Sequence, residues 1–175
     1  MKKYNNITKW MVRILVWIPV IVIACSIFGF SSQQGEESSG LSERAAKVFL
    51  HVADEVHIVT LTPDNEATYI ENLQTPIRKT AHMTEYMIFT FSLLAALWVW
   101  GVRNRKLYVL AFLLVVLFAS SDEIHQLFVP GRSGRATDVL IDSVGSMIGL
   151  FLVHLTVGKR KKRAAAEKET DKKGW

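Results

Sequence analysis

Four long apolar runs constrain the fold of this chain more than any other feature. They cover residues 10–30, 81–102, 107–129 and 137–158, and each is about 20 residues long. A helix of that length crosses the roughly 30 Å apolar core of a bilayer. The stretch "LYVLAFLLVVLFA" at 107–119 lacks the polar stripe that a helix of a water-soluble bundle needs. The sequence therefore predicts an all-α, polytopic membrane protein with four transmembrane helices.

The composition agrees with a membrane protein and argues against other classes. Hydrophobic residues make up 50% of the 175 residues, which is high for a soluble domain of this size. The single cysteine, Cys25, excludes a disulfide within the chain and a cysteine-based metal cluster. The net charge of +5 comes from basic residues that flank the apolar runs. We therefore expect membrane lipids as partners, with no nucleic acid, no cofactor and no resident metal.

The basic residues also predict the orientation, because cytoplasmic segments are enriched in Lys and Arg. With both termini in the cytoplasm, fifteen Lys and Arg lie inside and six outside. The sequence thus predicts a multi-pass protein of the cell membrane. Its parts are a cytoplasmic N-terminus (1–9), a four-helix membrane domain (10–158) and a basic cytoplasmic tail (159–175). We expect the tail to anchor the topology and to lie against anionic lipid.

The first apolar run has a second interpretation. Its basic start and apolar centre are typical of a signal peptide, and "VIAC" at 22–25 fits a lipoprotein cleavage box. Cleavage there would leave a lipidated Cys25 outside the cell. The apolar run continues through "SIFGF", which favours a retained helix with Cys25 as a small buried residue.

Residues 31–77 form the one sizeable extracytoplasmic loop. Its start, "FSSQQGEESSG", is polar and turn-rich, which predicts a mobile loop. "SERAAKVFLHVADEV" places Ala45, Val48, Phe49, Val52 and Val56 on one helical stripe, with Ser42 as the cap. "TPDNEATYIENL" predicts a second short helix, capped by Thr62 and with Pro63 in its first turn. We expect both to be interfacial helices on the bilayer rather than a substrate domain, because the loop is too small for its own core.

Polar and ionisable side chains gather at one end of the last three runs. At 1.5 Å per residue, these positions meet at one level, the extracytoplasmic headgroup boundary. Ionisable groups at that depth are costly and usually face inward, paired, at functional sites. The predicted binding cluster consists of Lys79, His82, Glu85, Tyr86, Asp122, Glu123, Gln126, Arg132, Asp138 and Asp142.

The fourth run also predicts how its helix packs. Asp138 and Asp142 are stacked at i, i+4, and Gly145 and Gly149 continue the same stripe. Glycines at that spacing allow another transmembrane helix to approach closely.

Several kinds of function fit these residues, and we favour a cup that binds a lipid or glycolipid headgroup. A second possibility is an intramembrane hydrolase that acts on a phosphate-bearing lipid. His82 or Glu123 would then be the general base, Lys79 and Arg132 would hold the phosphate, and Asp138 would orient the base. The sequence leaves open whether the protein is an enzyme.

Two further interpretations involve no lipid. "HMTE" and "DEIH" supply histidines and carboxylates that suit zinc or iron, although Lys79 would repel the ion. Alternatively, Lys79, Arg132 and Arg135 neutralise the carboxylates and form a purely structural polar network.

The segments "RKTAHMTEY" and "DEIHQLFVPGRSGRATDVLIDSVGSMIG" resemble the VanZ-like family, small bacterial membrane proteins named for a glycopeptide-resistance protein. The resemblance covers roughly residues 12–157 and includes "FSSQ" after the first run. It implies teicoplanin resistance at the cell envelope for some members, and no established reaction. Asp142 stands where the family more often has Asn. The resemblance carries over as signature positions Lys79, His82, Tyr86, Asp122, Glu123, Gln126, Arg132 and Asp138.

Overall fold

The computed structural model is all-helical over the backbone it describes, residues 6–33 and 35–173, and it describes side chains for 6–33 and 39–157. Residues 1–5 and 174–175 of the predicted cytoplasmic segments, and the side chains of the predicted tail, lie outside the described part. The helices are α1 (Asn6–Leu15), α2 (Trp17–Ser31), α3 (Gly35–Glu55), α4 (Glu66–Val99), α5 (Asn104–Gln126) and α6 (Ala136–Lys173).

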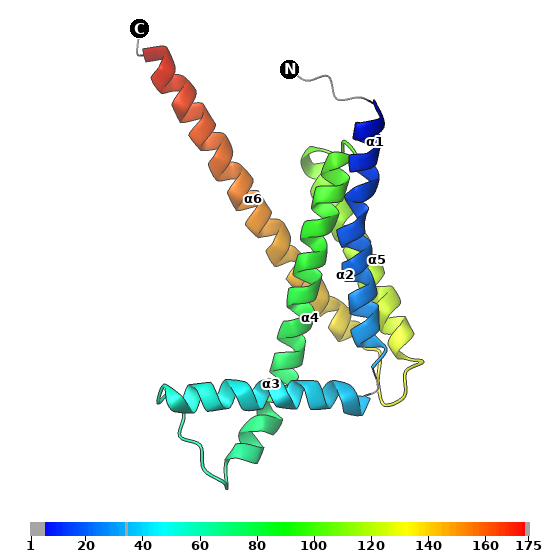
Figure 1. The fold of residues 1–175 in the computed structure, drawn as a ribbon, viewed down its shortest axis with the longest axis vertical. Coiled ribbons are helices and arrows are strands. Elements are labelled where there is room, and N and C mark those ends of the chain that lie inside the picture. Colours follow the sequence, from blue (N-terminus) through cyan, green and yellow to red (C-terminus); the bar gives the residue numbers. More distant parts are fainter. Residues whose placement is uncertain (1–5, 34, 174–175) are drawn as a thin grey trace.

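Four segments are long and apolar enough to cross a membrane, which confirms the predicted multi-pass architecture. They are Asn6–Ser31, Glu66–Val99, Asn104–Gln126 and Ala136–Val157. Helices α2, α4 and α5 run side by side, and α6 packs on α4 and α5 before it leans away (Figure 1). Helix α3 lies across one end of this bundle, opposite α1 and the C-terminal end of α6 (Figure 1). We call the end that carries α3 the α3 end.

The first span is interrupted once, between α1 and α2. Pro19 lies in the first turn of α2 and has no N–H to donate to the Leu15 carbonyl. The chain therefore breaks at Val16, whose own N–H still donates to the Val12 carbonyl at 3.1 Å. Cys25 lies within the first span and is exposed on the surface of α2 rather than packed between helices.

Helix α3 starts earlier than the sequence predicts. The Gly- and Ser-rich stretch from Gly35 is helical instead of a loop, and Ser42 is buried inside the helix rather than at its cap. The reason is tertiary packing, which overrides weak local turn preferences. Ala46 and Leu50 pack against Ile70 of α4 and form a small core of their own.

The opposite face of α3 is apolar and exposed. Val48, Phe49, Val52 and Val56 of the predicted stripe each have at least half of their surface accessible. An exposed apolar stripe on a helix that lies across a bundle end is typical of an interfacial helix.

The predicted second short helix is not a separate element. Helix α4 begins at Glu66 and runs for 34 residues through Pro76 into the membrane. Asn65, not Thr62, is its N-cap residue, and the Asn65 side chain accepts the Thr62 N–H at 2.9 Å. Packing of Ile70 against α3 holds the first turns of α4, so the one hydrogen bond that Pro76 removes does not end the helix.

Helices α4 and α6 approach closely at glycines, as predicted. A Cβ atom at Gly145 would lie 2.2 Å from the Met83 carbonyl oxygen, and one at Gly149 would lie 3.2 Å from the Met87 carbonyl oxygen. Between the same two helices, the Thr90 hydroxyl donates to Ser146 Oγ at 2.9 Å. These contacts fix the spacing of the two helices that carry most of the predicted binding cluster.

Candidate functional site

A cavity of about 410 Å³ opens at the α3 end, between α4, α6 and the loop that joins α5 to α6. Its size is within the range of small-molecule sites in proteins. Charged side chains of both signs line it. They are the basic residues Arg78, Lys79, Arg132 and Arg135 and the acidic residues Glu123, Asp138 and Asp142. We call this space the polar cavity.

Helix α5 builds one wall of the polar cavity through a short hydrogen-bond network. Glu123 accepts the backbone N–H of Arg135 at 2.7 Å, which ties the loop to the end of α5. Gln126 Nε2 lies 3.3 Å from both Glu123 Oε1 and Asp122 Oδ2, because the three residues share one helical face. Ser31 of α2 also donates to Asp122 Oδ2, at 3.0 Å. The network therefore links α2, α5 and the loop.

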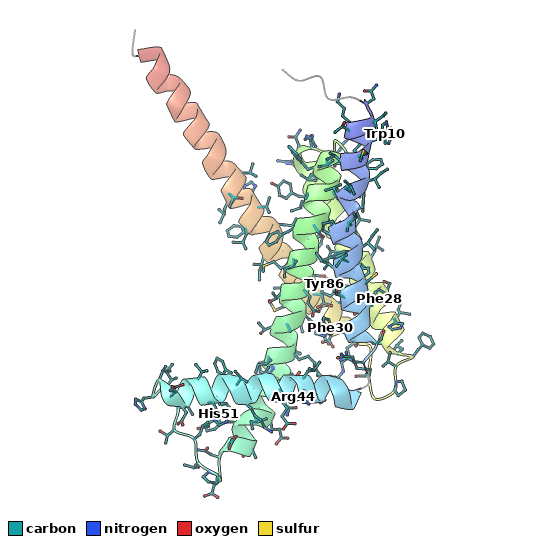
Figure 2. All side chains as sticks on the ribbon, viewed as in Figure 1. Trp10, Phe28, Phe30, Arg44, His51 and Tyr86 are labelled. Atoms are coloured by element: carbon teal, nitrogen blue, oxygen red, sulfur yellow. The ribbon has the colours of Figure 1, made fainter. Side chains whose placement is uncertain are left out.

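Deeper in the bundle lies a second layer of polar groups, almost closed to solvent. Tyr86, Asp122 and Asp142 have at most 1% of their surface exposed. The Tyr86 hydroxyl, Asp122 Oδ1 and Asp142 Oδ1 have no hydrogen-bond partner among the described residues. Figure 2 shows Tyr86 in the half of the bundle nearer to α3, at about the level of Phe28 and Phe30. We call these three residues the inner layer.

Aromatic rings bound the inner layer on the side of the bundle centre. The ring centroid of Tyr86 lies 6.2 Å from that of Phe118. The Phe118 centroid lies 4.8 Å from that of Phe89, with the rings tilted, and 5.2 Å from that of Phe28 in an edge-to-face contact. Polar groups so enclosed are costly in a membrane, where no water compensates them.

We call the four basic side chains that line the polar cavity its rim: Arg78, Lys79, Arg132 and Arg135. None of them forms an ion pair with a described carboxylate. Salt bridges between described side chains join only Lys47 to Glu43, His51 to Glu66 and His82 to Glu85. The described cations of the polar cavity therefore form no direct ion pair with its described carboxylates.

Arg132 reaches from the loop across the rim toward α2. Its Nη2 donates to the Phe30 carbonyl at 3.2 Å, whereas its buried Nε has no partner among the described residues. Burial, and next the nearby guanidinium of Arg78, lower the pKa of Arg132 below its ordinary value. Two guanidinium groups at close quarters favour an anion between them, because a phosphate can accept paired hydrogen bonds from each.

A second cavity of about 210 Å³ adjoins the first, and we call it the side cavity. The two cavities share Arg78, His82 and Arg132. The side cavity lies between α2, α3 and α4, and its other walls are mainly apolar. The apolar residues that line it are Phe30, Leu41, Ala45, Ile77 and Ala81.

His82 is half-buried at the boundary of the two cavities. Its Nδ1 lies 3.9 Å from Glu85 Oε2, one turn further along α4. A histidine beside a carboxylate suits proton transfer as well as binding. Among the described residues, no group of three or more His, Cys, Asp or Glu is placed to hold a metal ion.

The structure divides the predicted binding cluster into three parts. Seven of its ten residues line the polar cavity, Glu85 lines only the side cavity, and Tyr86 and Asp122 lie in the inner layer. His125, which shares a helical face with Asp122, lines neither cavity, and its ring lies 5.3 Å from that of Phe28.

Arg78 and Ser31 are among the residues of the site that the predicted cluster lacks. Arg78 lines both cavities. The prediction included its neighbour Lys79 instead, because Lys79 is a signature position of the family. Ser31 holds Asp122, and the only signal for it was its place in "FSSQ". A search for polar residues next to the ends of every apolar run would have found both residues.

Comparison with known proteins gives one match. The family model VanZ/LLP1 matches residues 16–157. Neither the curated protein sequences nor the solved structures contain a match to the chain. The match begins just before α2, includes both cavities and ends with the last residue of the fourth span, in agreement with the resemblance in the sequence. The chain therefore belongs to the VanZ/LLP1 family.

Proposed function

We propose that this protein binds a phosphate-bearing headgroup of an envelope lipid or glycolipid in the polar cavity. The observation that carries the proposal is the basic rim, whose Arg and Lys side chains form no ion pair with a described carboxylate. Arg78 and Arg132 repel each other, and an anion between them would offset that repulsion. The binding interpretation thus accounts for like charges that a structural network would have paired.

The acidic wall of the polar cavity suits the rest of such a ligand. Asp138 and Asp142 accept hydrogen bonds, so they can hold the hydroxyl or amine groups of a headgroup. Glu123 is already bound to the loop and to Gln126, and we assign it the role of keeping the rim in place.

We further propose that the α3 end faces the outside of the cell membrane and that both termini are cytoplasmic. This orientation puts fifteen Lys and Arg inside and six outside. A reporter that is active only in the cytoplasm should give a signal when fused after Arg163. The same reporter inserted at Gly35 should be silent. The reverse pattern would place the polar cavity inside and overturn an envelope-facing role.

Lipid mass spectrometry of the purified protein tests the binding role. We expect a phosphate-bearing envelope lipid with the wild type and little of it with Arg132→Gln. The matched control is Arg44→Gln, which removes an exposed arginine of α3 that lines neither cavity. If no variant and no wild-type sample carries such a lipid, or if Arg132→Gln carries as much as the control, the proposal fails.

The family resemblance extends the proposal to glycopeptide resistance. In that role the bound lipid would be a target, or a lipid near the target, of teicoplanin. Expression of the wild type in a susceptible host should raise the teicoplanin concentration that stops growth, and Arg132→Gln should not. Resistance that survives Arg132→Gln would separate it from lipid binding.

A lipid hydrolase is the second candidate, and the position of His82 favours it. His82 lies at the boundary of the cavities with Glu85 at 3.9 Å, where it could take a proton from water. In a hydrolase, His82→Gln should keep the bound lipid and reduce turnover by about 10²–10⁴-fold. In a binding protein, the same change should weaken binding and function together.

A further inference from the structure

The two cavities differ in character although they meet at the same arginines. The polar cavity is lined by charges, whereas the side cavity has apolar walls from three helices. Arg132 spans the boundary between them, because its side chain lines both and donates to the Phe30 carbonyl on α2. An anion held by Arg78 and Arg132 would therefore have a polar space on one side and an apolar space on the other.

The apolar wall of the side cavity continues along the surface of α3. Leu41 and Ala45 line the cavity, and Val48 and Val52 follow at helical spacing, all four exposed. This stripe gives a hydrocarbon chain an apolar path from the cavity to the bilayer. A soluble phosphate has no hydrocarbon chain to contact these apolar side chains, so the stripe favours a lipid as the ligand.

We propose that the side cavity holds the start of the lipid tail. The phosphate lies at the Arg78–Arg132 boundary, the headgroup fills the polar cavity, and the first methylene groups leave between α2, α3 and α4. This inference rests on the proposed headgroup binding and specifies the ligand as an amphiphile with a phosphate between head and tail. Specificity for the head and anchoring of the tail are thereby assigned to different walls.

Two alanines allow the side cavity to be filled without a change in charge. Ala45 of α3 and Ala81 of α4 both line it and both are exposed, so a larger side chain at either position meets open space. The variants are Ala45→Trp and Ala81→Trp, introduced from opposite walls. The control is Ala95→Trp, which makes the same substitution at an exposed alanine of α4 that lines neither of these two cavities, about 21 Å from Ala81 along the helix.

Two probes separate the tail from the phosphate. Long-chain phosphatidylglycerol, titrated into the detergent-solubilised protein and followed by native mass spectrometry, reports on the amphiphile. Inorganic phosphate, followed by calorimetry, reports on the arginines. We expect Ala45→Trp and Ala81→Trp to weaken binding of the lipid about tenfold or more and to leave phosphate binding unchanged, whereas Ala95→Trp changes neither. Arg132→Gln should weaken both.

The outcomes distinguish this inference from the proposed function. If the wild type binds both probes and neither cavity variant affects the lipid, the tail does not use the side cavity, although headgroup binding stands. If the wild type binds phosphate but no long-chain lipid, the ligand is a soluble phosphate and the inference is wrong. If both cavity variants lose both probes while Ala95→Trp retains them, the division between head and tail walls is wrong. Absence of both probes from the wild type refutes the proposed function itself.

Discussion

Substitution of Gly145 by alanine tests the contact that sets the geometry of the site. The new Cβ would lie 2.2 Å from the Met83 carbonyl oxygen and 2.8 Å from the Met83 Cα. Ordinary contact begins at 3.4 Å, so α4 and α6 would have to separate by roughly 1 Å. The opposing atoms are backbone atoms of a helix and cannot rotate away. The separation would also stretch the hydrogen bond between Thr90 and Ser146, now 2.9 Å long.

The expected loss of stability follows from these contacts. Overpacking of a well-packed contact costs about 1–3 kcal/mol, and a hydrogen bond between membrane helices contributes about 0.6 kcal/mol. Alanine regains up to about 1 kcal/mol through its better helix propensity. We therefore expect Gly145→Ala to lower the free energy of unfolding by roughly 2 kcal/mol, measured by reversible denaturation in mixed micelles.

A series of glycines provides the controls for this prediction. Gly149→Ala should cost less, because its Cβ meets Met87 at 3.2 Å or more and part of that contact is a flexible side chain. Gly29→Ala should be neutral or stabilising, because nothing lies within 4 Å of its Cβ. Equal stability of all three variants would refute the close approach of α4 and α6. Since Met83 adjoins His82, Gly145→Ala should also weaken lipid binding.

Three further predictions concern the site itself. Gly134→Ala would place a Cβ 2.1 Å from the Glu123 carbonyl oxygen, so it should displace the loop and break the hydrogen bond from the Arg135 N–H to the Glu123 side chain. We expect this variant to have a lower melting temperature and weaker lipid binding than the wild type. Asp142→Asn removes a buried carboxylate that has an unpartnered oxygen, so this variant should be at least as stable as the wild type in thermal unfolding; a loss above about 1 kcal/mol would mean that the charge is compensated. Tyr86→Phe removes a hydroxyl that has no partner among the described residues, and its free energy of unfolding should change by less than about 1 kcal/mol.

The spans were predictable because the bilayer imposes a length. Four apolar runs of about 20 residues have few alternatives, and the structure places a span over each. The close approach at Gly145 and Gly149 was predictable for a similar reason, since small residues at that spacing serve helix contacts. In both cases one physical constraint, the bilayer thickness or the closeness of two helices, acts on regularly spaced residues of a helix.

The loop was predicted less well because its structure depends on contacts between distant segments. Gly35 and the serines that follow favour turns locally, and Pro76 favours a helix end. Both preferences are small beside the packing of α3 on the first turns of α4, around Ala46 and Ile70. No local sequence pattern predicts that contact between α3 and α4. The sequence therefore predicted two short helices, whereas the structure has α3 and an extended α4.

The sequence predicted the depth of the polar cluster in the membrane. It did not predict which of its residues line the polar cavity and which lie in the inner layer. Helical rise places a residue along the membrane normal to within about a turn, which is enough to bring three helix ends together. It does not tell whether a side chain enters a cavity or the space between helices. Lys79 is exposed at the cavity rim, whereas Tyr86, two turns further along α4, is fully buried.

The order of charges along the helices gives the site a direction. On α4, Arg78, His82 and Tyr86 follow one another at intervals of one turn, from the rim to the inner layer, over about 12 Å. On α6, Asp138 lines the polar cavity and Asp142 extends from its wall into the inner layer. Cations thus gather at the rim, whereas the buried groups are acids and a phenol. A phosphate placed deep would meet these carboxylates, so the proposed ligand binds with its phosphate at the arginines. Its hydroxyl or amine groups then point toward the acidic wall, where the carboxylates have oxygens left to accept their hydrogen bonds.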